Sequence, residues 1–360
     1  MEIWEPEPER PEMATPTPNL LLSLALALLL PLLASPTSSP ITVSSPAGLV
    51  TGTRDGGVDS FLGIRYGHAA RFQAASRYTY PGGGPAGKAN VTALATGAWC
   101  YQATAPLKPS PDHTYAEDCL FLNIWRPAAG TGGREGSSKR PIPIAFWIHG
   151  GGFTQGSGSD PLFAGRALAA SQGMIVVTIN YRLGPLGFLV HDSTGKGGMH
   201  GLADVVVALK WVRDNAAAFG GDRDRVMVFG ESAGGCATCT LSVSPAAKGL
   251  LRSSIVQSGP CVGPWQPMST AMGMAERDAL FLMHGTTSLD GLATVPAENL
   301  TWPIPTGGYF LDDGLIMGKQ PSEYLAAGEL NVESIVFGGN SFDGTHDTSV
   351  FSLLTPFHCI

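Results

Sequence analysis

Six short apolar runs, separated by segments of helical pattern, constrain the fold of this 360-residue chain more than any other feature. Several of the runs are almost continuously apolar, as in parallel strands that are covered on both faces. The runs are residues 121–125, 142–148, 174–180, 225–230, 253–259 and 333–339. Helical patterns lie at 161–172, 201–218, 233–243 and 321–328. Strands that alternate with helices predict an α/β fold, with a central, mostly parallel, twisted sheet flanked by helices.

Two segments depart from this alternation. Residues 41–67 alternate in the β manner around glycine and Asp-Gly breaks, and they predict small antiparallel strands near the N-terminus. Residues 262–305 are less regular, and we expect an insertion or cap beside the sheet there. We expect an N-terminal extension and signal peptide over 1–34, followed by a single α/β domain over 35–360.

The apolar run Leu20–Ala34 suits the hydrophobic region of a secretory signal peptide and is short for a membrane span. A short membrane anchor is the alternative interpretation of this run. The residues before it are acidic, which is unusual for a signal peptide, so Met13 is a candidate initiator. Glycosylation sequons follow at Asn90 and Asn299, although sequons also arise by chance. With six cysteines, these features predict a disulfide-bonded glycoprotein that is secreted or lies in the secretory lumen.

Composition limits the class of partner. The formal net charge is −7 and hydrophobic residues make up 44% of the chain, as in a folded globule of enzyme size. An acidic chain offers no basic surface for nucleic acid or anionic lipid. We therefore expect a small-molecule partner and no nucleic acid, and the oligomeric state is left open.

The pentapeptide GESAG, residues 230–234, fits the G-x-S-x-G pattern, in which a serine stands on a tight turn between a strand and a helix. Glycines are needed there because the serine backbone is strained, and flanking side chains would collide with the neighbouring strand and helix. The pattern alone is weak. However, an apolar run precedes it and a helical pattern follows it, so we predict Ser232 as a nucleophile.

A second glycine-rich turn, WIHGGGF at 147–153, closes another predicted strand. When a nucleophile attacks an ester carbonyl, negative charge develops on the oxygen, and preorganised backbone N–H groups stabilise it. An HGGG-type loop and the residue after the nucleophile supply these donors in the G-x-S-x-G arrangement. The pattern predicts that Gly151, Gly152 and Ala233 form an oxyanion hole. A flexible loop is the alternative for a triple glycine by itself.

From about residue 45 onward, the sequence resembles the type-B carboxylesterase/cholinesterase family of the α/β-hydrolase fold. The resemblance rests on several motifs, among them WCYQ (99–102), EDCLFLNIW (117–125), WIHGGGF (147–153), INYRLGPLGFL (179–189), GLADVVVALKWVRDNAAAFGGDRDRVMVFGESAGG (201–235) and SIVFGGNSFDGT (334–345). It implies hydrolysis of small-molecule esters through a Ser-acid-His triad and an acyl-enzyme intermediate. We expect no metal or other cofactor.

The resemblance also implies a triad acid. The family places it in a turn of the N-x-D-E-G type after a strand, and the matching stretch NSFDG puts Asp343 at that position. An aspartate has a shorter arm than the usual glutamate but can still orient an imidazole. A plain turn aspartate before Gly344 is the alternative. Glu231, next to the serine, is expected to line the substrate pocket, with a buried structural carboxylate as the alternative.

Further family features concern the scaffold. The resemblance implies buried ion pairs between Arg182 and Asp204 and between Arg71 and Glu117. It also implies a disulfide between Cys100 and Cys119. Cys261 matches one member of the family's second disulfide, but its partner is not evident from the sequence. Cys236 and Cys239, three residues apart on a predicted helix, are interpreted as buried thiols rather than as a redox or metal motif.

The triad histidine has no clear candidate. Only His346 and His358 follow Asp343, whereas the family's histidine comes from a separate loop much further along. His346 is too close to Asp343 in the sequence to bridge acid and serine. His149 and His200 are interpreted as structural residues of the oxyanion loop and of a helix start. We therefore expect a chain that is truncated at its C-terminus, or a member that has lost its base.

The sequence thus predicts a secreted serine carboxylic-ester hydrolase. A non-catalytic binding or adhesion protein on the same fold, or an inactive truncated form, is the alternative. The serine and its full surroundings are present, which favours the enzyme. Residues 101–118 contain no tryptophan, and the family's choline-binding tryptophan lies in this loop, so we do not expect cholinesterase activity.

Overall fold

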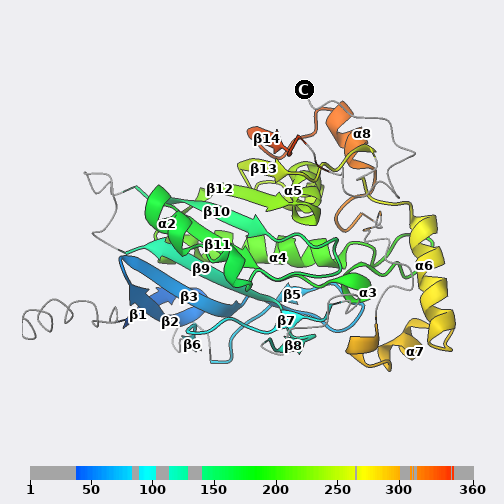
Figure 1. Ribbon diagram of the computed structural model, residues 1–360, viewed down its shortest axis with the longest axis horizontal. Helices are drawn as coiled ribbons and strands as arrows, with labels where there is room; N and C mark the ends of the chain where they lie inside the picture. Colours follow the sequence, from blue (N-terminus) through cyan, green and yellow to red (C-terminus); the bar gives the residue numbers. More distant parts are fainter. Residues whose placement is uncertain are drawn as a thin grey trace, which may run out of the picture.

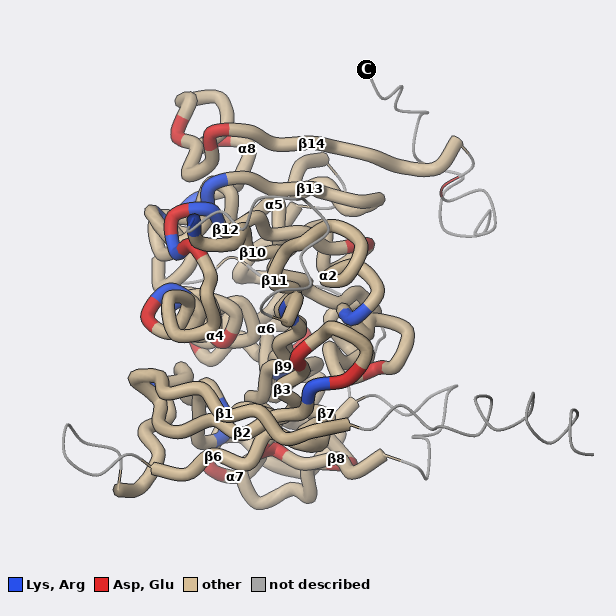
Figure 2. Tube along the Cα trace, turned by 90° about the vertical axis from the view of Figure 1, so that its left-hand side faces the viewer, with Lys and Arg blue, Asp and Glu red and all other residues tan. Residues whose placement is uncertain are grey.

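The central feature of the computed structural model is one mixed sheet. The structure describes residues 38–82, 89–102, 113–128, 140–263, 266–300, 309, 311, 314–341 and 343. Within these residues the strand order of the sheet is β1-β2-β3-β9-β11-β10-β12-β13-β14, and β6 pairs with β2. Figure 2 shows the strands β11, β10, β12, β13 and β14 in this order. The bounds are β1 Ser39–Ser45, β2 Gly48–Asp55, β3 Val58–Arg65, β6 Asn90–Thr92, β9 Phe121–Pro127, β10 Ile142–Ile148, β11 Ile175–Ile179, β12 Gly221–Glu231, β13 Ser253–Gln257 and β14 Ser334–Gly338.

The sheet has an antiparallel half and a parallel half. The strands β1, β2, β3, β9 and β11 pair antiparallel in succession, whereas β11, β10, β12, β13 and β14 pair parallel. All six predicted apolar runs are strands, and the predicted N-terminal strands are antiparallel, so the α/β prediction is confirmed. Two short sheets lie apart, β4 Gly67–His68 with β5 Ser76–Arg77 and β7 Trp99–Cys100 with β8 Tyr115–Ala116.

Helices cover both faces of the sheet (Figure 1). They are α2 Arg166–Gln172, α3 Gly184–Phe188, α4 His200–Asn215, α5 Ala233–Val243, α6 Thr270–Met283, α7 Leu289–Ala293 and α8 Pro321–Ala326, with 3-10 turns η2 Pro161–Phe163, η3 Ala216–Phe219, η4 Pro245–Ala247 and η6 Ala297–Asn299. Side chains alternate across β11: Val176 packs with Ala169 of α2, whereas Val177 joins the large core cluster that includes residues of α4 and α5. The largest fully buried side chain, Trp211, belongs to α4.

The segment expected to be irregular contains a regular helix. The 14-residue α6 and the shorter α7 lie beyond the ends of the parallel strands (Figure 1). Only Gly273 and Leu280 of α6 are buried, while Met272 and Leu282 are exposed. Because its apolar residues do not form one buried stripe, the helical period is weak in the sequence. Among the helices of the described residues, none combines the length and apolar character needed to cross a bilayer.

Candidate active site

Four parallel strands end at one edge of the sheet, and the predicted site residues follow those ends. Ile148, the last residue of β10, pairs with Gly230 of β12, and Glu231 pairs with Gln257 at the end of β13. Gln257 in turn pairs with Gly338 at the end of β14. In open α/β sheets, ligands bind outside the carboxyl ends of the strands. The register therefore gathers the HGGG turn, Ser232 and Asp343 at the edge where a ligand is expected.

Ser232 occupies a strained turn between β12 and α5. Its backbone has φ 54° and ψ −121°, a combination that an L-residue rarely adopts and that costs about 1–3 kcal/mol. Neighbouring structure holds the turn: the Ser232 N–H donates to the Gln257 carbonyl at 2.9 Å, and the Ser232 carbonyl accepts from Cys236 N at 2.9 Å. The serine is partly exposed at the apex. Such a turn presents a hydroxyl outward while its backbone stays fixed.

The glycines around Ser232 are required for close backbone approach. A Cβ added to Gly259 would lie 2.0 Å from the Ser232 carbonyl oxygen, and one added to Gly234 would lie 2.1 Å from the Ile148 carbonyl oxygen. A real Cβ essentially never comes this close to a backbone atom. Any side chain at these two positions would therefore separate α5 from the ends of β10 and β13.

The HGGG turn lies directly beside Ser232. A Cβ added to Gly150 would lie 3.3 Å from the Ser232 Cβ. Gly151 and Gly152 have φ values of +111° and +62°, which suit glycine. The Gly151 carbonyl accepts from the N–H groups of Thr154 and Gln155, each at 3.0 Å. Within the described part of the chain, the Gly151 and Gly152 N–H groups have no hydrogen-bond acceptor, and Ala233 starts a helix, where N–H groups are also unpaired.

His149 stabilises the HGGG turn through a hydrogen bond and ring stacking. Its Nδ1 lies 2.8 Å from the Gly150 carbonyl oxygen and so carries the proton, and its ring stacks on Tyr181 at 4.4 Å between centroids. The Tyr181 hydroxyl donates to the His149 carbonyl at 2.9 Å. Burial lowers the pKa of His149 to about 4, so the ring is neutral at physiological pH. This agrees with the structural interpretation of His149.

Asp343 lies at the same edge and is held by three donors. The Ser258 hydroxyl donates to its Oδ2 at 2.5 Å, the Asn340 N–H to Oδ2 at 2.8 Å, and the Asn340 side-chain amide to Oδ1 at 3.2 Å. The hydrogen bond from Ser258, together with those from Asn340, lowers the pKa of Asp343 below its ordinary value. Sequence reasoning missed Ser258. The signal for it is a small polar residue at the carboxyl end of a predicted parallel strand.

Glu231 is exposed at the end of β12, so the alternative of a buried carboxylate is wrong. Partial loss of hydration raises the pKa of Glu231, and the negative charge of Asp343 raises it further. The strand register places Glu231 at the same edge of the sheet as the end of β14, which Asp343 follows. Glu231 also lies beside the HGGG turn, because a Cβ added to Gly150 would be 3.1 Å from its Oε2.

The cysteines pair partly as expected. Cys100 and Cys119 form the disulfide that the resemblance implies. Cys239 forms a second disulfide with Cys261, so the interpretation of Cys239 as a free thiol is wrong. The reason is the packing of α5 against β13, which brings the middle of the helix close to the loop after that strand. Cys236 is a buried free thiol, and burial raises its pKa to about 12.

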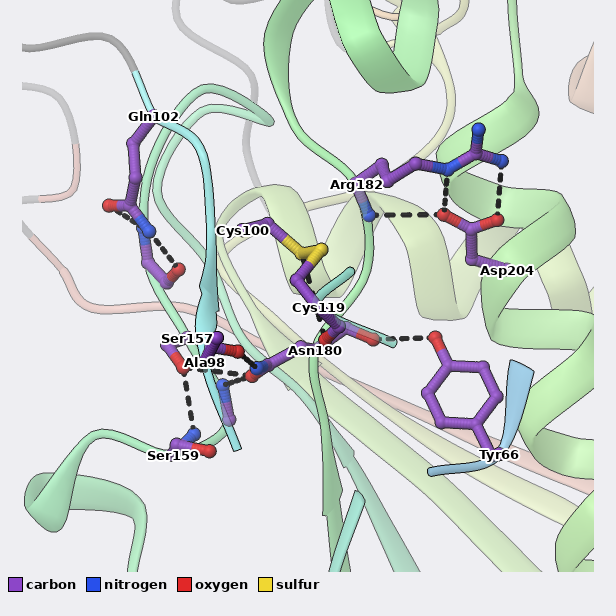
Figure 3. The surroundings of a disulfide bond; sticks show 12 residues. Tyr66, Ala98, Cys100, Gln102, Cys119, Ser157, Ser159, Asn180, Arg182 and Asp204 are labelled. Carbon is purple, nitrogen blue, oxygen red and sulfur yellow. Dashed lines mark hydrogen bonds and ion pairs between the residues drawn. A yellow bond between two sulfur atoms is a disulfide. The ribbon is translucent and has the colours of Figure 1, made fainter. Parts of the chain in front are cut away.

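Two ion pairs brace the surroundings of the first disulfide. Asp204 accepts from Arg182 Nε at 2.8 Å and from Nη2 at 2.7 Å, and both side chains are almost completely buried (Figure 3). Arg71 and Glu117 also form a two-pronged pair, but Glu117 is 37% exposed, so this pair is not fully buried. Both pairs join separate segments of the chain and act as scaffold.

Several predicted sites remain predictions. Asn90 and Asn299 are exposed, as a glycan acceptor must be. His346 and His358 lie outside the described residues, as do 1–37, which include the predicted signal peptide. Among the described residues, no group of three His, Cys, Asp or Glu side chains is placed to hold a metal ion.

Comparison with known proteins identifies the family. A sequence model described as "Carboxylesterase family" matches residues 39–346. The chain belongs to the carboxylesterase family. The carboxylesterase relatives include the para-nitrobenzyl esterase of Bacillus subtilis, which is 39% identical over 262 residues covering 72% of this chain and 51% of the relative. The human bile salt-activated lipase is 43% identical over 189 residues, 49% of this chain and 24% of the lipase. The chicken acetylcholinesterase is 42% identical over 193 residues, which cover 50% of this chain and 24% of the acetylcholinesterase.

Solved carboxylesterase structures share the fold. A PNB esterase superposes with a TM-score of 0.72 at 33% identity, covering 88% of this chain and 66% of the esterase. The carboxylesterase EST55 of Geobacillus stearothermophilus also superposes with a TM-score of 0.72, at 32% identity, and the match covers 86% of this chain and 64% of EST55. The expected α/β-hydrolase fold is confirmed. The chain spans about half the length of the para-nitrobenzyl esterase and about a quarter of the lipase and the acetylcholinesterase.

Proposed function

We propose that the protein is a serine carboxylic-ester hydrolase that acts on small-molecule esters through an acyl-enzyme intermediate. The observation that carries the proposal is Ser232, held at φ 54° in the strand-to-helix turn with the HGGG turn beside it. The family match and the esterases and lipase among the relatives support ester hydrolysis. They do not favour the non-catalytic alternative.

In the proposed first step, Ser232 Oγ bonds to the ester carbonyl carbon and gives up its proton to a base. The carbonyl oxygen becomes an oxyanion and accepts hydrogen bonds from the N–H groups of Gly151, Gly152 and Ala233. These donors are preorganised, so they stabilise the charge without rearranging. The ester C–O bond then breaks, and the alcohol leaves with a proton. Water hydrolyses the acyl-serine by the same route, which releases the acid and restores the Ser232 hydroxyl.

Asp343 is proposed as the acid that orients the base. Its three hydrogen bonds hold the carboxylate charged and fixed in direction, as an orienting group requires. The base itself is not assigned. His149 lies in the HGGG turn and is neutral, but its ring N–H donates to the Gly150 carbonyl, so we do not propose His149 as the base. Glu231 is proposed to line the substrate pocket.

We also propose that the protein is a glycoprotein of the secretory pathway, with Asn90 and Asn299 as acceptors. Two disulfides, Cys100–Cys119 and Cys239–Cys261, support this location, because disulfides persist in oxidising compartments.

The test is covalent labelling. A fluorophosphonate probe should label Ser232 in the full chain, and p-nitrophenyl acetate should be hydrolysed. Ser232→Ala should abolish labelling, and in a chain whose base activates Ser232 it should lower turnover of the ester by about 10⁴-fold or more. Ser171→Ala, which removes an exposed hydroxyl from α2, is the matched control and should change neither. Labelling that persists in Ser232→Ala, or no labelling of the wild-type chain, would refute the proposed function.

A further inference from the structure

The side chain of Gln102 forms a two-bond clamp on the end of the HGGG turn. Its Nε2 donates to the Gly156 carbonyl at 2.7 Å, and its Oε1 accepts from the Gly156 N–H at 3.0 Å (Figure 3). Gln102 and Gly156 are 54 residues apart in the sequence. A side-chain amide carries a donor and an acceptor side by side, so Gln102 can bind the C=O and the N–H of one residue at the same time.

The segment that carries Gln102 is itself anchored. Cys100, two residues before it, is bonded to Cys119. At the start of the segment, the Asn180 amide donates to the Ala98 carbonyl at 2.9 Å. The same Asn180 accepts from the Ser157 hydroxyl at 2.8 Å, so it ties residues on both sides of the clamp. Figure 3 shows Gln102, the disulfide and Asn180 around one stretch of backbone.

Gly156 packs directly against the beginning of the turn. Its φ is +107°, and a Cβ added to it would lie 2.5 Å from His149 Nδ1 and 2.6 Å from the Gly150 carbonyl oxygen. The intervening residues are linked to Gly151, whose carbonyl accepts from Thr154 N and Gln155 N. Residues 149–156 therefore form a closed loop, and a shift of Gly156 would move Gly151 and Gly152.

We propose that Gln102 is a positioning residue for the oxyanion loop, residues 149–156, and that the Cys100–Cys119 disulfide anchors this clamp. Gln102 does not touch the reacting atoms in this proposal. It fixes the direction of the Gly151 and Gly152 N–H groups through Gly156. The catalytic meaning of the inference rests on the proposed function, whereas the clamping of the loop does not.

Hydrogen–deuterium exchange of the full chain tests the clamp without any substrate. Gln102→Met keeps the length of the side chain and removes both hydrogen bonds. Because the variant loses both hydrogen bonds to Gly156, backbone amides in 149–156 should exchange roughly tenfold faster or more. The exchange rates of the backbone amides in β12 should be the same as in wild type. Gln172→Met, at an exposed position of α2, is the matched control and should leave 149–156 unchanged. If Gln102→Met leaves the exchange of 149–156 as in wild type, the inference is wrong.

A kinetic comparison separates positioning from general stability. With p-nitrophenyl acetate, Gln102→Met should lower kcat by roughly tenfold and leave KM within about twofold, because a misdirected oxyanion hole weakens transition-state binding. Gln102→Glu keeps the acceptor for the Gly156 N–H but places a carboxylate oxygen against the Gly156 carbonyl, so it should lower kcat at least as far as Gln102→Met. A matched rise in KM with kcat unchanged would overturn the positioning role. An inactive wild-type chain would refute the proposed function, while the exchange experiment would still decide whether Gln102 clamps the loop.

Discussion

At the scale of single residues, the Arg182–Asp204 pair shows how a buried charge depends on its partner. The carboxylate of Asp204 is fully buried and accepts from the Arg182 N–H, Nε and Nη2, while Arg182 Nη1 donates to the Gln73 carbonyl at 2.8 Å. Taking both charges out of water is costly, and the hydrogen bonds offset that cost. Removing one partner leaves the other charge buried and unpaired.

We predict that Asp204→Ala lowers the free energy of unfolding by about 3–5 kcal/mol, because the Arg182 guanidinium stays buried without its carboxylate. Urea denaturation followed by tryptophan fluorescence measures the change. Glu333→Ala is the control, since Glu333 and Arg252 are 67% and 51% exposed and such surface pairs contribute about 0–1 kcal/mol. Equal losses in the two variants would contradict the prediction.

Asp343 provides a residue-scale test based on pH. Its pKa is lowered chiefly by the hydrogen bond from Ser258, which favours the charged carboxylate. The native state therefore gains from the charged form above the ordinary carboxyl pKa, and it loses this gain as pH falls through the lowered pKa. Removing the donor should move the titration midpoint of Asp343 upward, toward the ordinary value of 3.8.

Two separate substitutions of Ser258 are needed, because its backbone φ of 49° strains any residue that has a Cβ. Ser258→Gly relieves the strain and Ser258→Ala keeps it, and both remove the hydroxyl. A rise in the Asp343 pKa that both variants share, measured by carboxyl carbon NMR, assigns the effect to the hydrogen bond. A midpoint unchanged in both variants would show that the Ser258 hydroxyl does not set the pKa.

At the scale of elements, the contact between α5 and the end of β10 has no room for a side chain. We predict that Gly234→Ala destabilises the fold by about 3 kcal/mol or prevents folding, because the new Cβ would lie 2.1 Å from the Ile148 carbonyl oxygen. Gly338→Ala at the end of β14 is the control, since its Cβ would meet nothing within 4 Å. Chemical denaturation of both variants measures the difference, and a loss below about 0.5 kcal/mol for Gly234→Ala would refute the close contact.

The strands could be predicted from the sequence and α6 could not, for a reason of burial. The runs at 142–148 and 174–180 are almost continuously apolar because β10 and β11 lie in the middle of the sheet. In α6, by contrast, Leu282 is 84% exposed, so apolar residues do not mark one face. A periodic pattern of apolar residues arises where one face of an element is buried, and few residues of α6 are buried.

The candidate site was predictable only where one local pattern contains the chemistry. GESAG and HGGG each specify a turn, and the structure places both turns side by side. The contacts of Ser258 with Asp343, Gln102 with Gly156, and Cys239 with Cys261 join segments far apart in the sequence. Such contacts depend on strand register and helix packing, which no short pattern carries. The resemblance supplied Cys100–Cys119 because that pair belongs to the family.

At the scale of the whole molecule, the sheet has an apolar edge. In the described part of the chain, β14 is the last strand and pairs only with β13. Val336 and Phe337 in β14 are 55% and 54% exposed. An edge strand with unpaired backbone groups and apolar side chains is a template for pairing with another chain. We therefore expect β14 to be the part of the surface that governs self-association.

We predict that Val336→Lys raises the monomer fraction of the full chain, because a charge on an edge strand opposes pairing and the apolar area falls. Size-exclusion chromatography with light scattering, at several protein concentrations, measures this fraction. Ser334→Lys is the matched control: Ser334 lies two residues earlier, on the same face of β14, so it adds the same charge without removing apolar surface. If both variants act equally, charge repulsion alone accounts for the change. If the wild-type chain is monomeric at every concentration, β14 is not an association site.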